Sequence, residues 1–106
     1  MVTNDSVPRP RYHYTFMQDI YALMEAHNDD QPGDFPAMMA YNTAADLVDG
    51  MFKGVADTEQ IRATYDKFID VMNSNAAYEA QDESMASAAE AYREIAQEAA
   101  LAKEGK

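Results

Sequence analysis

The chain has 106 residues, of which 19 are acidic and 8 are basic, so its formal net charge is −11. A chain of this length forms one domain with a single modest core. The charge disfavours direct binding to DNA, RNA or an anionic bilayer, because their phosphates would be repelled. Since cysteine is absent, disulfides, thiolate nucleophiles and cysteine metal sites are excluded.

The composition favours helices. Alanine and methionine are good helix formers and are abundant, whereas glycine and proline occur only four times each. No apolar stretch approaches the roughly 18–20 residues that a membrane span needs. The first ten residues also lack the apolar core of a secretory signal. We therefore expect an all-α, cytoplasmic protein without a membrane segment.

The first residues differ in character from the rest of the chain. Residues 1–11 predict a flexible N-terminal arm, because Pro8 and Pro10 favour extended backbone around them. Residues 12–106 are expected to form a single helical domain. No lysine or arginine occurs from residue 12 to residue 52, so a short basic arm precedes an acidic body.

A first helix is predicted over about Tyr12–His27, where apolar side chains recur at helical spacing. They form two rows, which are Tyr12, Phe16, Ile20, Leu23 and His27, and Tyr14, Met17, Tyr21 and Met24. A helix that is apolar around most of its circumference is either central in the fold or shared with a partner. Pro32-Gly33 then favours a turn, and Asp34 an N-cap.

Three further helices are expected. The second covers about Phe35–Lys53, and the third begins at the capping residue Asp57 and ends near Met72, before Asn73-Ser74-Asn75. The fourth covers about Ala76–Lys103 and would be about 42 Å long. Its heptad seam consists of Tyr78, Met85, Tyr92 and Ala99, with Gln81, Ala88, Ile95 and Ala102 as companion row. Four helices with short connections predict an up-and-down bundle with a long C-terminal helix.

The spacing of acidic and histidine residues fits neither an EF-hand nor a di-iron bundle, so a dedicated metal site is disfavoured. The acidic segments Asn28–Asp34 and Asp46–Asp49 lack the ligand pattern of an EF-hand. Neither His13 nor His27 follows a glutamate by three residues, as a di-iron bundle requires. A glycine-rich phosphate loop and a nucleophile elbow are also missing. The sequence therefore predicts no catalytic residue, no metal and no cofactor.

The strongest functional signal is a row of glutamates in the predicted fourth helix. Its members are Glu79, Glu83, Glu90, Glu94 and Glu98. Four residues of helix rise by about 6 Å, which is close to the separation of successive phosphates in a nucleic acid strand. Like charges at this spacing repel each other. The row is therefore a solvated face that maintains solubility, an adaptation to high salt, or a surface that binds a basic partner.

We expect a non-enzymatic binding protein, an inhibitor or accessory factor, that docks its acidic helices on a basic protein surface. An extreme form would be a nucleic-acid mimic from a phage or mobile element that blocks a nucleic-acid-handling enzyme. The glutamate row would supply the charge contacts, and the aromatic anchors would be Tyr12, Tyr14 and Tyr21. The alternative is a structural subunit that self-associates through the first helix and the heptad seam. The failed motifs make an enzyme or metal-binding bundle the least favoured of the three.

Overall fold

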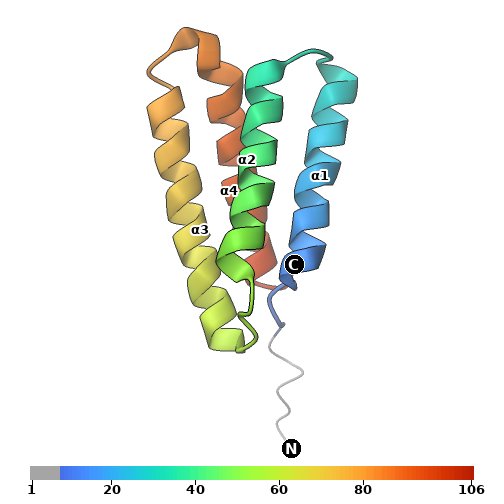
Figure 1. Cartoon of the computed structure of the whole chain (residues 1–106), viewed down its shortest axis with the longest axis vertical. Coiled ribbons are helices and arrows are strands. Elements are labelled where there is room, and N and C mark those ends of the chain that lie inside the picture. Colours follow the sequence, from blue (N-terminus) through green and yellow to red (C-terminus); the bar gives the residue numbers. More distant parts are fainter. Residues whose placement is uncertain (1–7) are drawn as a thin grey trace, which may run out of the picture.

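The computed structural model describes residues 8–106, which form a bundle of four helices (Figure 1). The elements are α1 (His13–Asp30), α2 (Phe35–Phe52), α3 (Thr58–Glu79), the short 3-10 helix η2 (Glu83–Met85) and α4 (Ala86–Lys103). Successive α-helices run in opposite directions. The prediction of an all-α, up-and-down bundle is confirmed. None of the helices in the described part of the chain combines the length and the apolar character needed to cross a membrane.

Side-chain caps fix the starts of α2 and α3. The carboxylate of Asp34 accepts a hydrogen bond from the backbone N–H of Ala37, and that of Asp57 accepts one from Gln60. Each cap satisfies an N–H group that has no partner in the first turn of a helix. Gly33, with a φ of 81°, turns the chain into the Asp34 cap. Both predicted helix starts are confirmed.

The third helix is longer than the sequence predicts. It ends at Glu79 rather than near Met72, so Asn73-Ser74-Asn75 lies inside α3. The reason is burial, since Met72 and Ala76 lie four residues apart on the buried face of the helix. Packing of that face stabilises the turn between them, although its own residues have low helix propensity.

The fourth helix is correspondingly shorter, and its predicted range of Ala76–Lys103 is wrong. The chain turns at residues 80–82, where the carboxylate of Asp82 accepts hydrogen bonds from the backbone N–H and the hydroxyl of Ser84. Such local bonds compete with the helical pattern and interrupt it. After η2, α4 begins at Ala86, and its 18 residues span about 27 Å.

The same interruption removes the predicted heptad seam. Tyr78 lies in α3 and Met85 in η2. The seam residues that remain on α4 are Ala88, Tyr92, Ile95, Ala99 and Ala102. All five are buried in the core of their own bundle. They are therefore not available to a second copy of the chain, contrary to the self-association expected for this helix.

The first helix lies at the edge of the bundle rather than at its centre. It extends to Asp30, three residues beyond the predicted end, and its main neighbour is α2. Only Phe16 and Ile20 are fully buried. Its other apolar residues pack partly buried against the core, namely Met17, Tyr21, Leu23 and Met24. One of the two predicted apolar rows thus supports the core, and the other is only partly covered.

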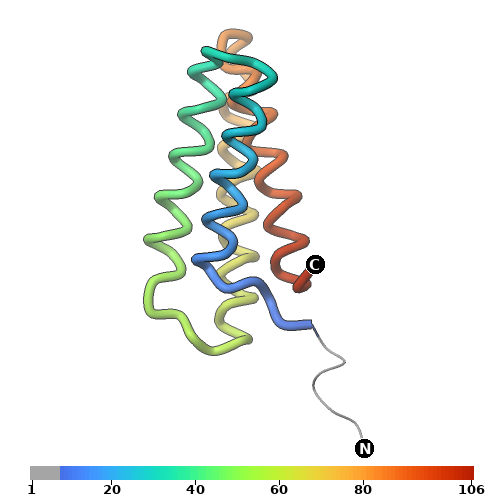
Figure 2. The backbone as a smooth tube through the Cα atoms, turned by 90° about the vertical axis from the view of Figure 1, so that its right-hand side faces the viewer, coloured from blue at the N-terminus to red at the C-terminus, as the bar shows by residue number. Residues whose placement is uncertain are grey.

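The core is built around a close pairing of α2 with α4. In an up-and-down bundle these two helices lie on a diagonal. Their contact is nevertheless more extensive than the contacts between the adjacent pairs α2–α3 and α1–α4. Their buried faces are rich in alanine, with Ala37, Ala40, Ala44 and Ala45 on α2 and Ala88, Ala91, Ala96, Ala99 and Ala102 on α4. Small side chains let the two backbones approach. In Figure 1, α3 and α1 lie to the left and right of the pair, and in Figure 2, turned by 90°, α1 lies in front of α3.

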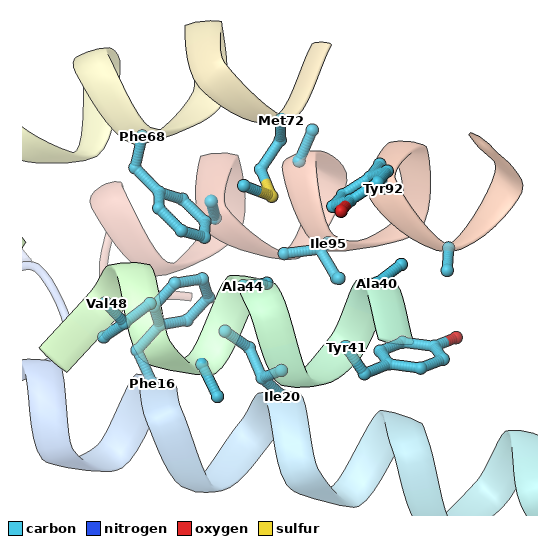
Figure 3. Close-up of a cluster of buried hydrophobic side chains, with 14 of the residues drawn as sticks. Phe16, Ile20, Ala40, Tyr41, Ala44, Val48, Phe68, Met72, Tyr92 and Ile95 are labelled. Carbon is cyan, nitrogen blue, oxygen red and sulfur yellow. The ribbon is translucent and has the colours of Figure 1, made fainter. Parts of the chain in front are cut away.

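Aromatic rings connect the two outer helices across this pair. Phe16 of α1 makes edge-to-face contacts with Tyr65 and Phe68 of α3, with ring centroids 5.2 and 5.5 Å apart. Phe52, at the end of α2, packs edge-to-face on Tyr65, with ring centroids 4.7 Å apart. Along the bundle the core continues with Ile20, Tyr41, Met72, Tyr92 and Ile95 (Figure 3). All four helices therefore share one core.

Of the arm predicted over residues 1–11, residues 1–7 lie outside the described residues. Arg11, at its end, lies against the helices. Its backbone N–H donates a hydrogen bond to the carbonyl of Ala102 at 2.8 Å, and its carbonyl accepts one from the Tyr65 hydroxyl at 2.7 Å. The guanidinium of Arg62 donates to the carbonyl of Pro8. Arg11 therefore belongs to the helical domain.

We expect Ala99→Leu to lower the free energy of unfolding by about 1–3 kcal/mol, because Ala99 is fully buried and the larger side chain would push α4 away from the helices packed against it. Ala100→Leu, at the next and exposed position of α4, is the matched control and should change stability by less than about 0.5 kcal/mol. Urea denaturation followed by circular dichroism measures both. Equal stability of the two variants would contradict close packing around the alanine-rich buried face of α4.

Candidate functional site

Charge is distributed unevenly along the bundle axis. We divide each helix at its midpoint into a half near the α1–α2 and α3–α4 connections and a half near the chain termini. The acidic half consists of residues 22–43 and 69–94, and the terminal half of residues 8–21, 44–68 and 95–106. The acidic half contains ten acidic residues and one basic residue, so its net charge is −9. The terminal half contains eight acidic and seven basic residues, so its net charge is −1.

The predicted row of five glutamates is not continuous. Glu79 is the last residue of α3 and Glu83 the first of η2, so they do not lie on successive turns of one helix. Glu90, Glu94 and Glu98 do follow each other on α4. The regular phosphate-like spacing that suggested a nucleic-acid mimic is therefore limited to these three glutamates.

Two of the glutamates on α4 have partners inside the protein. The hydroxyl of Tyr41 on α2 donates a hydrogen bond to Glu94, and the guanidinium of Arg11 donates one to Glu98. Burial, together with the Glu94 carboxylate, raises the pKa of Tyr41 well above its usual value, so the hydroxyl stays protonated as the donor. In contrast, Glu83 and Glu90 are exposed and form no ion pair with any of the described residues.

The three predicted aromatic anchors lie in the terminal half. Tyr12 and Tyr14 are exposed at the start of α1, and Tyr21 is partly buried against the core. Glu79 and Glu83 lie at the other end of the bundle, and the 18 residues of α1 alone span about 27 Å. The structure therefore divides the predicted site between two ends, and of its acidic members only Glu98 lies in the same half as the tyrosines.

Arg11 connects elements that otherwise touch little. Its guanidinium donates hydrogen bonds to Asp19 of α1 at 2.8 Å, to Glu98 of α4 and to the carbonyl of Lys106. The side chain is partly buried, so these charge-assisted bonds are less screened by water than a surface ion pair. Arg11 thus joins the start of α1 to the end of α4, two helices with few direct contacts.

We expect Arg11→Ala to lower the free energy of unfolding by about 1–3 kcal/mol, since Asp19 and Glu98 would lose their shared cation. Arg9→Ala removes an exposed arginine two residues earlier and should change stability by less than about 0.5 kcal/mol. Chemical denaturation at neutral pH compares the variants. If both lose the same stability, the Arg11 contacts do not hold the two helices together.

Asp34 connects three helices in the acidic half. One oxygen of its carboxylate accepts a hydrogen bond from the Ser87 hydroxyl on α4 at 2.6 Å, and the other lies 2.8 Å from Nε2 of His27 on α1. The hydrogen bonds from Ser87 and His27 lower the pKa of Asp34 below its usual value. Because the serine donates its proton to the carboxylate and not to the histidine, the three residues do not form a base-activated nucleophile.

The lowered pKa predicts a pH-dependent contribution of Asp34 to stability. A carboxylate whose pKa is lower in the folded than in the unfolded chain stabilises the fold above the unfolded value of about 3.9 and loses this effect as the pH falls through the folded pKa. We expect Asp34→Asn, which retains a capping side chain, to be less stable by about 1 kcal/mol at neutral pH. The difference should shrink toward pH 2.

Urea midpoints measured as a function of pH test this expectation. Asp29→Asn, which removes an exposed charge from the same end of α1, is the control for loss of one negative charge. A difference between wild type and Asp34→Asn that does not change with pH would show that the Asp34 charge has no role in joining the helices.

The acidic half also carries an apolar surface. Phe35, at the start of α2, is 78% exposed, and Met39, one turn later, is 47% exposed. Together with four neighbours they line a shallow groove of about 500 Å³. We call it the Phe35 groove, and its residues are Phe35, Pro36, Met38, Met39 and Asn42 of α2 and Met85 of η2.

The sequence contains a signal for this surface in the spacing of the apolar residues of α2. Phe35 and Met39 lie on the side of α2 opposite to its buried row, in which Ala37, Tyr41 and Val48 recur at helical spacing. An exposed phenylalanine and methionine on that side cannot belong to the core. The contribution of Met85 was not predictable in the same way, because it depends on the turn between α3 and α4.

Within residues 8–106, no three acidic or histidine side chains gather closely enough to hold a metal ion. Comparison of the chain with protein-family models, curated proteins and solved structures gives no significant match. The acidic half and its groove are thus the features with the clearest chemical character.

Proposed function

We propose that this chain is a cytoplasmic, non-enzymatic binding protein that docks its acidic half on a basic surface of a partner protein. The observation that carries the proposal is the net charge of −9 in one half of the bundle against −1 in the other. A surface of one sign attracts an oppositely charged partner over a distance and accelerates its association.

The way in which the charge is separated supports binding over simple solubility. The two halves differ little in acidic residues, ten against eight, but strongly in basic residues, one against seven. A surface that only keeps a protein soluble works best with both signs interspersed. Unbalanced like charges instead repel each other and destabilise the fold, an effect that a basic partner would offset.

The contacts are expected from exposed acids of the acidic half. From the predicted set these are Glu83 and Glu90, with the half-buried Glu79 beside them, and the neighbouring connections add Asp29, Asp30 and Asp82. Glu94 contributes to the field but is already bonded to Tyr41. Glu98 and the three tyrosines lie in the terminal half and are not part of the proposed surface.

Charge reversal tests the proposal. The immobilised protein captures partners from an extract of the source organism at low salt. We expect the captured protein to be basic, and Glu83→Lys/Glu90→Lys to weaken its binding by about tenfold or more. The control Asp49→Lys/Glu104→Lys makes the same change in net charge at exposed positions of the terminal half. It should weaken binding by less than about threefold.

Equal weakening by the two double variants would overturn the docking of the acidic half, and so would binding that does not weaken with added salt. Competition by double-stranded DNA identifies the kind of partner. A captured protein that DNA releases is itself a nucleic-acid-binding protein, whereas a protein that DNA leaves in place binds through some other basic surface.

A further inference from the structure

The Phe35 groove has a fixed floor and exposed rims. Met38 and Met85 are partly buried and pack against the core, so their positions are set by the fold. Phe35 and Met39 project from successive turns of α2 and are both exposed to water. Such exposed apolar area is unfavourable unless another surface covers it.

The shape of the groove favours a macromolecule over a small ligand. A pocket for a small molecule usually encloses most of the ligand surface, but the Phe35 groove is shallow and open along α2. Methionine side chains are flexible and polarisable, and they adapt to apolar groups of different shape. A shallow apolar groove of this kind can receive the apolar side of a helix, whose side chains are presented one turn apart.

The charge around the groove selects the kind of helix. Asp82 and Glu83 lie at the start of η2, shortly before the groove residue Met85, and Asp46 follows one turn after Asn42. The acidic half offers a single basic residue in return, Arg93. A second copy of this chain would bring two negative surfaces together and is disfavoured by repulsion. A helix with one apolar and one cationic face is complementary to both the groove and its surroundings, because its apolar face can cover the groove and its cationic face can pair with the acids around it.

We propose that the Phe35 groove binds the apolar face of a cationic amphipathic helix that belongs to the partner protein. This inference rests on the proposed function, because the acidic half supplies the attraction, and it adds that apolar contacts fix where and in which direction the partner helix lies. Lysine or arginine side chains of the helix would contact Asp82, Glu83 and their neighbours, while its leucine-type side chains cover Phe35 and Met39.

Two synthetic peptides of identical composition test the inference. In the first, leucines and lysines are arranged so that leucine lines one face of a helix. In the second, the same residues are scrambled so that no apolar face forms. We expect the amphipathic peptide to bind the intact protein about tenfold or more tightly than the scrambled one in calorimetry at moderate salt. In NMR spectra, the methyl signals of Met38, Met39 and Met85 should shift, and that of the buried Met72 should not.

Variants locate the effect. Phe35→Ser/Met39→Gln changes only exposed side chains, so the bundle should still fold, and it should abolish the preference for the amphipathic peptide. Leu101→Gln is the matched control, because Leu101 is 46% exposed in the terminal half, almost the same as Met39. It should retain the preference.

The outcomes separate this inference from the proposed function. If both peptides bind equally well and both are released by salt, the groove is not the site, while docking through charge is retained. If Phe35→Ser/Met39→Gln retains the preference for the amphipathic peptide, the groove is also excluded as the binding site. If neither peptide binds but a basic protein is captured through the acidic half, the partner does not present a cationic amphipathic helix, and the inference is wrong.

Discussion

The close packing of α2 against α4 is the constraint on which the rest of the structure depends. Alanines on both faces bring these diagonal helices together, and α1 and α3 lie on opposite sides of the pair and meet through their aromatic side chains. The contacts of α1 are mainly with α2, and α1 makes few direct contacts with α4. Polar side chains bridge α1 and α4 at both ends of the bundle. Arg11 contacts Asp19 and Glu98 in the terminal half, and Asp34 contacts His27 and Ser87 in the acidic half. Glu98, which in the sequence resembles a free surface charge, is therefore one of the residues that join helices of the bundle.

The helix starts were predictable because their signals are local. Asp34 before Phe35-Pro36, and Asp57 three residues before Gln60, each place a capping side chain within reach of the N–H group that it satisfies. The boundary between the last two helices was not predictable in this way. Asn73-Ser74-Asn75 has the composition of a helix end, but the burial of Met72 and Ala76 outweighs it.

For the candidate site, the sign of the charge followed from the sequence but its position did not. The glutamate row assumed a helix that runs unbroken through residues 80–85, and the turn there divides it. The concentration of charge arises because antiparallel helices place residues 22–43 beside residues 69–94, which share no local pattern. The exposure of Phe35 likewise became evident only once the buried side of α2 was known.

The separation of charge between the two halves also gives the bundle an electric dipole along its length. The negative pole lies at the end that carries the α1–α2 connection and η2, where the Phe35 groove is also found. In the field of a cationic partner such a dipole experiences a torque before any side chains touch. The bundle would therefore rotate during approach, so that its groove faces the partner. A larger fraction of encounters would then occur in the orientation that allows binding.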